Sequence, residues 1–319
     1  MTDTRASATA PFADLPLPVD AAGDPLEVSV VIATLERPDD VRTCLEHLAA
    51  QTRRPHEVVV VDASASDATA KVVDGFPWAH YLHNDAGLGT LPLSRRIGVA
   101  GTTGAVVAFL DDDAYADPDW LANLALAYEP GVGGVGGQAR NGQPGELTQG
   151  LDEIGRLLPN GIVTGNFAAD PGRDLDVDHI IGCNMSFRRE ALAQSGGIPA
   201  WPAGVSSLRE DLFLSLRVRD AGWRLRFTPR AGVFHVGSPQ VKGRRFDLRY
   251  DFTGVRNHLF VLVVHFGPTS PIVRKAIATT LGRSSAQAVR STAGALARPL
   301  AALLGILVGV WRGLTYDDR

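Results

Sequence analysis

The sequence predicts an α/β fold with a mostly parallel central sheet flanked by helices. Two observations carry this prediction. From residue 27 to residue 113, short runs rich in valine and isoleucine alternate with amphipathic segments. Such alternation favours βαβ units, in which parallel strands are joined by right-handed crossovers. Polar side chains also follow these runs where the strands end, and that edge of an α/β sheet is where ligands bind.

The first half is expected to contain four strands and three helices, each supported by its own pattern. Pro38 suits the first helical position. Val41, Leu45 and Leu48 then fall on one apolar stripe. The expected strands are 27–34, 57–64, 79–84 and 104–113, and the expected helices are 38–51, 67–76 and 91–101.

The pattern changes after residue 130. Before that point a helix is expected over 117–129, where Asp117 can cap the first turn. The glycine-rich stretch 131–140 is predicted to be irregular, and 141–176 is predicted to be a long loop. Further on, 177–192 is typical of a strand entering a helix, and 209–227 of a helix ended by Gly222 and followed by a strand.

The two termini differ in composition from the centre. Residues 1–26 are rich in Ala, Asp, Pro and Thr, so a disordered arm is expected there. Near the other end, 300–311 is a run of 12 apolar residues. A membrane-spanning helix needs about 20, so the run is expected to form a core helix or an interfacial anchor.

Bulk composition excludes some classes of protein. The formal net charge of −4 provides no basic field, so no nucleic-acid partner is expected. The two cysteines are too few for a disulfide scaffold, which favours a reducing, cytoplasmic compartment.

Three consecutive aspartates, Asp111 to Asp113, follow the apolar run "AVVAFL". A solvated turn is one interpretation, since aspartate is common in turns. The other follows from the position at the carboxyl edge of the sheet, where clustered carboxylates are best neutralised by Mg²⁺ or Mn²⁺. Because Mg²⁺ usually binds through carboxylates together with substrate phosphates, a phosphorylated ligand is expected.

Three segments carry a resemblance to a known family. They are "VSVVIATLERPDDVRTCLEHLAAQTRRPHEVVVVDAS", "LDDDAYADPDWL" and "REDLFLSLRVRDAGWRLRF", in this order. From about residue 27 to residue 240 the chain resembles the family-two inverting glycosyltransferases of the GT-A fold. The resemblance implies a nucleoside-diphosphate sugar as donor, Mg²⁺ or Mn²⁺ as cofactor, and a hydroxyl acceptor on a glycan or a lipid-linked glycan.

The resemblance also divides the chain. It implies a nucleotide-sugar-binding half at 27–130 and an acceptor-binding, catalytic half at 131–240, with acceptor specificity expected in the 141–176 loop. A helical extension follows at 241–319. Basic residues beside apolar patches in that extension indicate either packing on the catalytic domain or a peripheral contact with the inner face of the cell membrane.

For the donor, the resemblance implies contacts from the ends of the first two strands. Thr34, Glu36 and Arg37 are expected to line the nucleotide, and Asp62 to contact its base. Either Arg95 or Arg96 is expected to face the diphosphate.

For the metal, Asp113 is the first candidate and Asp111 the second, with Asp111 also approaching the ribose. Asp112 is counted with the donor contacts, although it lies between the two and is the weakest candidate of the three. His235 is expected to reach the metal or the diphosphate; a structural role is the alternative.

For catalysis, the resemblance implies that Asp211 is the general base, with Glu210 as its neighbour or a partner of the acceptor. The alternative is that both only complement the dipole of their helix. Asn184, in "GCNMSFRR", is expected to line the donor pocket.

Two other classes of protein remain as alternatives. A nucleotidyltransferase would usually have a glycine-rich phosphate loop after the first strand, and "ATLERPDD" contains no glycine. A non-catalytic sugar-nucleotide-binding protein would have no use for Glu210 and Asp211.

Overall fold

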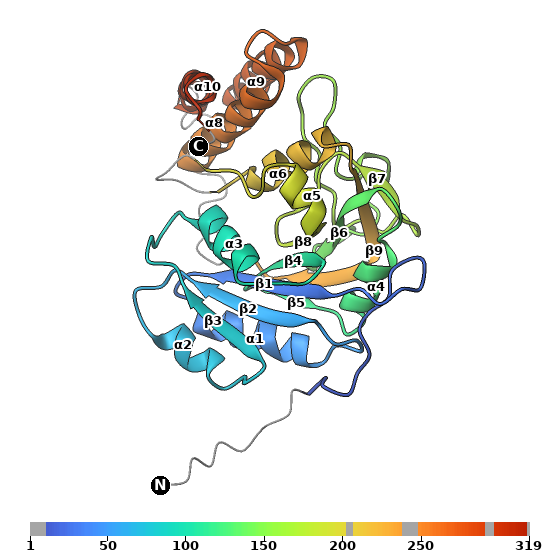
Figure 1. Ribbon diagram of the computed structural model, residues 1–319. Coiled ribbons are helices and arrows are strands. Elements are labelled where there is room, and N and C mark those ends of the chain that lie inside the picture. The colour runs from blue at the N-terminus through green and yellow to red at the C-terminus, as the bar shows by residue number, and fades with distance from the viewer. Residues whose placement is uncertain (1–10, 202–206, 238–247, 291–296, 318–319) are drawn as a thin grey trace.

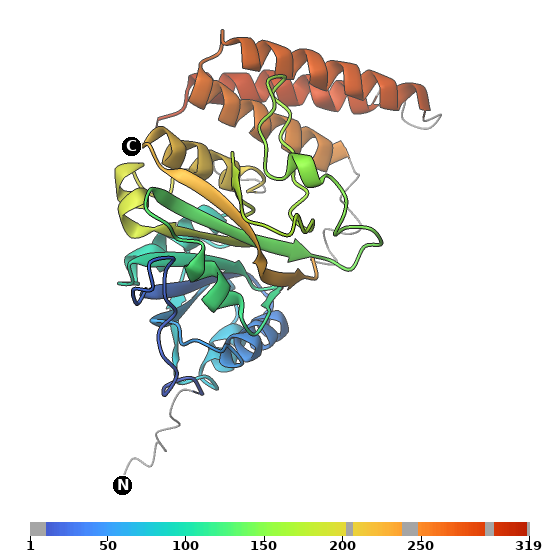
Figure 2. The same cartoon turned by 90° about the vertical axis from the view of Figure 1, so that its right-hand side faces the viewer.

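The computed structural model describes residues 11–201, 207–237, 248–290 and 297–317. A central sheet is covered on one face by α1, α2 and α4 and on the other by α3, α5 and α6 (Figure 1). Three long helices near the C-terminus form a further layer beyond α6, as the turned view shows (Figure 2).

The first half of the sheet matches the prediction. Every residue of β1 is buried, which explains its unbroken apolar run. β1 pairs in parallel with β2 and β4, and β2 pairs in parallel with β3. The elements are β1 (Val28–Thr34), α1 (Pro38–Ala49), β2 (Glu57–Asp62), α2 (Ala68–Val73), β3 (Ala79–His83), α3 (Leu91–Ala100) and β4 (Val106–Asp111).

The second half continues the same sheet with mixed pairing. The order is β3-β2-β1-β4-β8-β6-β9-β5, and β7 pairs with β9. β8 is antiparallel to β4 and β6, whereas β6 and β9 are parallel. The elements are β5 (Ala114–Ala116), α4 (Trp120–Leu126), β6 (Val132–Arg140), the 3-10 turn η1 (Leu151–Glu153), β7 (Leu175–Val177), β8 (Asn184–Arg188), α5 (Arg189–Gln194), α6 (Glu210–Asp220) and β9 (Arg224–His235).

The prediction of irregular structure at 131–140 is wrong, because this stretch forms β6. Neighbouring side chains leave no room for a Cβ atom at several positions of this strand, which explains its glycines. A Cβ atom on Gly134 would lie 2.7 Å from the side chain of Leu225 and 2.8 Å from that of Phe187, and one on Gly136 would lie 2.7 Å from Ile180. Only glycine therefore fits at these two positions of β6.

Two smaller predictions also need correction. Asp117 does not cap α4, which begins at Trp120; its carboxylate instead accepts hydrogen bonds from Arg140 Nη2 at 2.6 Å. The arm expected to be disordered is folded over residues 11–26, where Phe12 is buried against Trp78, with ring centroids 4.9 Å apart. Residues 1–10 lie outside the described residues.

The C-terminal layer consists of α8 (Leu248–Phe266), α9 (Pro271–Arg290) and α10 (Ala297–Leu314). α10 packs closely on α8 through glycines: a Cβ atom on Gly305 would lie 2.9 Å from the carbonyl oxygen of Phe252. The apolar run at 300–311 is thus part of an 18-residue helix. Among the described helices, only α10 has the length and hydropathy of a membrane span, and 28% of it is buried.

Candidate active site

The carboxyl ends of β1, β2 and β4 bring the predicted polar residues to one edge. The strand register places Thr34 beside Asp62 and Ala33 beside Asp111. After β4 the chain turns into β5, which pairs with the end of β9 so that Ala114 lies opposite His235. Residues separated by more than 100 positions in the sequence therefore meet at this edge.

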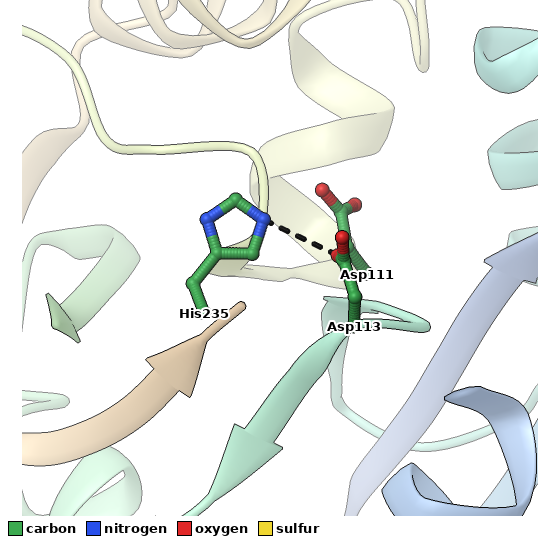
Figure 3. Close-up of side chains that lie close together, drawn as sticks. All are labelled: Asp111, Asp113 and His235. Atoms are coloured by element: carbon green, nitrogen blue, oxygen red, sulfur yellow. Dashed lines mark ion pairs between the residues drawn. The ribbon is translucent and has the colours of Figure 1, made fainter. Parts of the chain in front are cut away.

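Asp111, Asp113 and His235 form a cluster that suits a divalent cation. Each contributes one ligand atom, and these atoms lie within 4.8 Å of one another. His235 Nε2 lies 3.2 Å from Asp113 Oδ1 (Figure 3). Two carboxylate oxygens suit Mg²⁺ or Mn²⁺, and the imidazole nitrogen favours the transition metal of the two, Mn²⁺.

The protonation states of Asp113 and His235 are also compatible with a divalent cation at this place. Burial alone would lower the pKa of His235, but the hydrogen bonds to Asp113 and Cys183 and the nearby negative charges raise it to about 11. Burial would raise the pKa of Asp113, yet His235 and Arg37 lower it. A proton on His235 thus balances Asp113, and a divalent cation would replace that proton, since histidine binds metals in its neutral form.

Asp112 points away from this cluster and supports the loop after β1. It accepts a hydrogen bond of 2.7 Å from Thr34 Oγ1 and one of 2.8 Å from Arg37 Nη1. Burial, opposed by Arg37 and Thr34, raises its pKa to about 7. Thr34 and Asp112 are both buried and paired with each other, and contact of either one with the donor stays a prediction. Arg37 remains half-exposed at the edge.

Asp62 orients two polar neighbours. It is fully buried and accepts hydrogen bonds from the Ser64 amide at 2.9 Å and from Tyr81 Oη at 3.1 Å. Burial and the Asp62 charge raise the pKa of Tyr81 to about 12. Glu36 has a left-handed backbone, φ 54°, and its amide donates to Ser64 Oγ at 2.6 Å. Contact between Asp62 and a base stays a prediction.

Arg95 lies below the edge and joins three parts of the site. It is 2% exposed. Its Nη2 lies 3.2 Å from Asp111 Oδ1 and donates to the Gly182 carbonyl at 2.8 Å, and its Nη1 pairs with Glu210. Arg96 is exposed on the other side of α3. Arg95 therefore binds the carboxylates of the site, and contact of Arg95 or Arg96 with the diphosphate stays a prediction.

The pair Glu210–Asp211 begins α6, directly after Arg209 in a left-handed conformation with φ 76°. Glu210 is buried against Arg95. Asp211 is half-exposed, and its Oδ2 accepts a hydrogen bond of 3.1 Å from the Gly182 amide. The two carboxylates thus differ: Glu210 is committed to an ion pair, whereas Asp211 faces the surface of the site.

Asn184 has a buried position, and its expected contact with the donor stays a prediction. Its side chain is fully buried. It donates to the carbonyls of Gln138 and Ala231 at 3.0 and 2.9 Å and accepts from Trp120 Nε1 at 2.9 Å. It therefore fastens β8 to β6, β9 and α4.

Sequence reasoning did not single out Ser64 and Tyr81, which donate hydrogen bonds to Asp62. Ser64 follows Asp62 by two residues, a spacing typical of an Asx turn, so a local signal was present. Tyr81 is 19 residues from Asp62 in the sequence, and only the parallel pairing of β2 with β3 brings the two together.

Comparisons with known proteins agree with this geometry. The family model described as glycosyl transferase family 2 matches residues 29–196, and that of glycosyl transferase family group 2 matches residues 164–313. The chain is 33% identical over 190 residues to a glucosyl-dolichyl phosphate glucuronosyltransferase of Haloferax volcanii. That match covers 54% of this chain and 56% of the relative, so the chain spans little more than half the length of this relative.

Solved structures share the fold. A mannosyltransferase from Pyrobaculum calidifontis, in complex with GDP-Man and Mn²⁺, is 17% identical with a TM-score of 0.57, covering 94% of this chain and 90% of its own. S. aureus TarS 1-349 is 14% identical with a TM-score of 0.59, covering 89% and 81%. The fold agrees with the GT-A expectation, and the first family match covers more than half of the sequence. The chain belongs to glycosyl transferase family 2.

Proposed function

We propose that the protein is an inverting glycosyltransferase that moves a sugar from a nucleoside-diphosphate sugar to an acceptor hydroxyl. The observation that carries the proposal is the arrangement around Arg95, which connects the cluster containing Asp111 to the helix containing Asp211. Within this proposal, 27–130 holds most of the donor and 131–240 holds the acceptor and the base.

Asp211 is the general base of this proposal. Glu210 forms a buried ion pair with Arg95, so its carboxylate is not available to accept the proton of an acceptor hydroxyl. Asp211 has solvent access and is oriented by the Gly182 and Leu212 amides, at 3.1 and 2.8 Å. A carboxylate fixed in this way can take the proton of a hydroxyl that approaches from the open side.

Asp111, Asp113 and His235 would hold a divalent cation, with Mn²⁺ favoured by the imidazole. When bound, the cation supplies positive charge for the diphosphate as it leaves. Arg37 reaches the same edge and donates to Asp113 Oδ2 at 3.4 Å, which adds a cation from the chain itself.

The acceptor is proposed to be lipid-linked and to be met at the inner face of the cell membrane. The Haloferax volcanii relative is named for a dolichyl phosphate-linked substrate. In this chain α10 exposes an apolar stripe on the side away from α8. Its members are Leu300, Leu303, Leu304, Leu307, Trp311 and Leu314. An apolar helix face of this kind can lie in the interface of a bilayer.

The experiment that tests this function separates donor binding from transfer. Thermal shifts with a panel of nucleoside diphosphates and Mn²⁺ identify the nucleotide, and transfer is then measured with the matching sugar nucleotides. Asp211→Asn is expected to keep the metal-dependent thermal shift and lose transfer. Transfer at the wild-type rate by Asp211→Asn would remove it as the base, and no metal-dependent shift with any nucleotide would contradict the donor class.

A further inference from the structure

A pocket of about 560 Å³ lies at the end of β9 that is opposite the metal cluster. Its walls come from β7, the start of β9 and the C-terminal ends of α6 and α8. Cavities of about 300–1,000 Å³ are the usual size of binding sites for small ligands. Arg224 in the pocket and His235 in the metal cluster lie at the two ends of β9, more than about 20 Å apart at about 3.3 Å per residue. A single sugar cannot contact both places, so the pocket is separate from the metal cluster.

Asp178 fixes two arginines in the wall of this pocket. Its carboxylate is mostly buried, and Oδ2 accepts a hydrogen bond of 2.9 Å from the Leu157 amide. Oδ1 lies 3.1 Å from Arg219 Nη1, and Oδ2 lies 3.3 Å from Arg156 Nε. A guanidinium has five N–H donors, so Asp178 orients each arginine while engaging only part of its donors.

The other charged groups of the pocket are also paired. Asp176 Oδ2 lies 3.2 Å from Arg224 Nη1, and Asp220 Oδ2 lies 3.2 Å from His265 Nδ1. Burial lowers the pKa of His265, although Asp220 opposes this effect, so the imidazole is neutral at pH 7. The charged side chains that line the pocket are therefore three arginines and three aspartates, and their charges cancel. A lining without net charge favours a neutral ligand over a phosphate or a metal ion.

Apolar surface lies between these polar groups. Trp223 and Phe266 line the pocket beside Leu216 and Leu225. Phe266 is 37% exposed, and its ring lies edge-on to that of His265, with centroids 4.3 Å apart. Aromatic carbon that stays accessible in a pocket provides an apolar contact for a ligand.

A sugar unit is a ligand that fits both kinds of surface. Its hydroxyl groups donate and accept hydrogen bonds, so neighbouring hydroxyls can bind a guanidinium and a carboxylate that are held side by side. The C–H groups of its ring are apolar and can pack on aromatic carbon. A neutral sugar also needs no excess charge in the pocket, which agrees with the balanced lining.

We propose that this pocket binds a neutral sugar unit of a glycan, at a site separate from the one where transfer takes place. The proposal depends neither on the inverting mechanism nor on the donor, because it uses none of the residues at the carboxyl edge of the sheet. Arg156 belongs to the 141–176 loop, so a glycan bound here would contact the loop that is expected to determine acceptor specificity.

The test is saturation-transfer NMR of the full chain, without a sugar nucleotide, using the methyl glycosides of glucose, galactose, mannose and N-acetylglucosamine. We expect at least one of them to bind with a dissociation constant of about 1–10 mM, as is usual for so small a ligand. Arg219→Gln should raise this constant by at least about tenfold, because hydrogen bonds to a charged group are lost. Arg230→Gln is the matched control, since Arg230 also pairs with an aspartate, Asp174 at 2.9 Å, but does not line the pocket. Absence of binding by all four glycosides would overturn the proposal, as would equal losses in the two variants.

A second variant keeps the test decisive if Arg219→Gln folds poorly. Phe266→Ala removes the exposed ring and changes no charged group, and it should weaken binding by about three- to tenfold. Phe234→Ala, which changes a side chain 43% exposed at the other end of β9, is its control and should bind as the wild type does. Because Phe234 precedes His235, an equal or larger loss in Phe234→Ala would place the sugar near the metal cluster and overturn the proposal.

Two competitors identify the place and the class of ligand. A panel of nucleoside diphosphates with Mn²⁺ is expected to leave glycoside binding unchanged, because these are proposed to bind at the carboxyl edge of the sheet. Inorganic phosphate is also expected not to compete, because the pocket has no net charge. Displacement by a nucleotide with metal would assign the sugar to the catalytic site, and displacement by phosphate would assign the pocket to an anion. Either result would overturn the proposal.

Discussion

The carboxyl edge of the sheet and the α8–α10 layer both contain buried charges, but they balance them differently. At the edge, Asp112, Asp113 and Glu210 receive cations from other parts of the chain, namely Arg37, His235 and Arg95. In the helical layer, Arg256 and Arg312 have no described carboxylate beside them. The charges at the edge are thus paired within the chain, whereas the layer holds two cations for which no carboxylate lies among the described residues.

The largest expected effect concerns the metal cluster at the edge. Asp113→Asn removes a carboxylate ligand that is 5% exposed and balanced by His235. Turnover is expected to fall by about 10²- to 10³-fold, because charge on the leaving diphosphate loses its stabilisation. Steady-state transfer rates across a Mn²⁺ titration measure this. Asp74→Asn, which changes an exposed carboxylate at the end of α2, is the control; full activity in Asp113→Asn would contradict the assignment.

The next effect concerns the buried ion pair between Arg95 and Glu210 at the edge. Arg95→Gln leaves Glu210 buried without its partner, which is expected to cost about 3–5 kcal/mol of the free energy of unfolding. The double variant Arg95→Met with Glu210→Leu removes both charges and should recover most of that loss without recovering transfer. Urea unfolding and transfer assays measure the two quantities. A stable Arg95→Gln variant would mean that Glu210 can stay buried without a positively charged partner.

A smaller effect follows from His258, which connects the layer to the 141–176 loop by donating from Nε2 to the Gly161 carbonyl at 2.7 Å. Burial, with the charge of Arg209, lowers its pKa from 6.5 to about 4. The unfolded chain therefore binds a proton more readily, and stability is lost as the pH falls from 6.5 towards 4. His258→Gln keeps a donor without titrating, so its thermal midpoint should fall less over this range. Parallel curves for both proteins would remove His258 as the cause.

The smallest expected change in stability belongs to the exposed stripe of α10. Leu304→Glu with Leu307→Glu alters two side chains that are about half exposed. The free energy of unfolding should change by only about 0.5 kcal/mol per site, while vesicle binding is lost. Leu126→Glu on α4, 40% exposed, is the matched control. A strongly destabilised double variant would mean that this face is covered within the protein, and unchanged vesicle binding would remove α10 as the membrane contact.

The sequence predicts the first half of the fold well because its strands are continuous apolar runs and its helices begin at recognisable residues such as Pro38. β6 could not be predicted in the same way. Its glycines oppose strand propensity and are explained only by side chains distant in the sequence, such as Phe187 and Leu225. Local preference carries no information about that crowding.

The site follows the same rule. Asp111, Asp113 and His235 can be grouped from the sequence because of their places at strand ends and because of the family resemblance; the structure brings them together, and binding of a metal there stays a prediction. The direction of each side chain could not be predicted. Asp112 and Asn184 have residue types typical of binding sites, yet both are turned inward and hold neighbouring segments together. Glu210 and Asp211 are adjacent in sequence, and only the buried Arg95 distinguishes their roles.

β9 has a consequence for how this protein could vary in length. β9 pairs with β6 in two stretches, and a bulge separates them between Thr228 and Val233. The last stretch, Val233 to His235, also pairs with β5 and places His235 opposite Ala114. Because side chains alternate along a strand, deleting one residue inside this last stretch would turn His235 to the opposite face, whereas the bulge before it can absorb a change of length. Length differences among natural variants should therefore accumulate in the 141–176 loop or in this bulge, and deletion of Phe234 should abolish metal binding while most of the hydrophobic core remains folded.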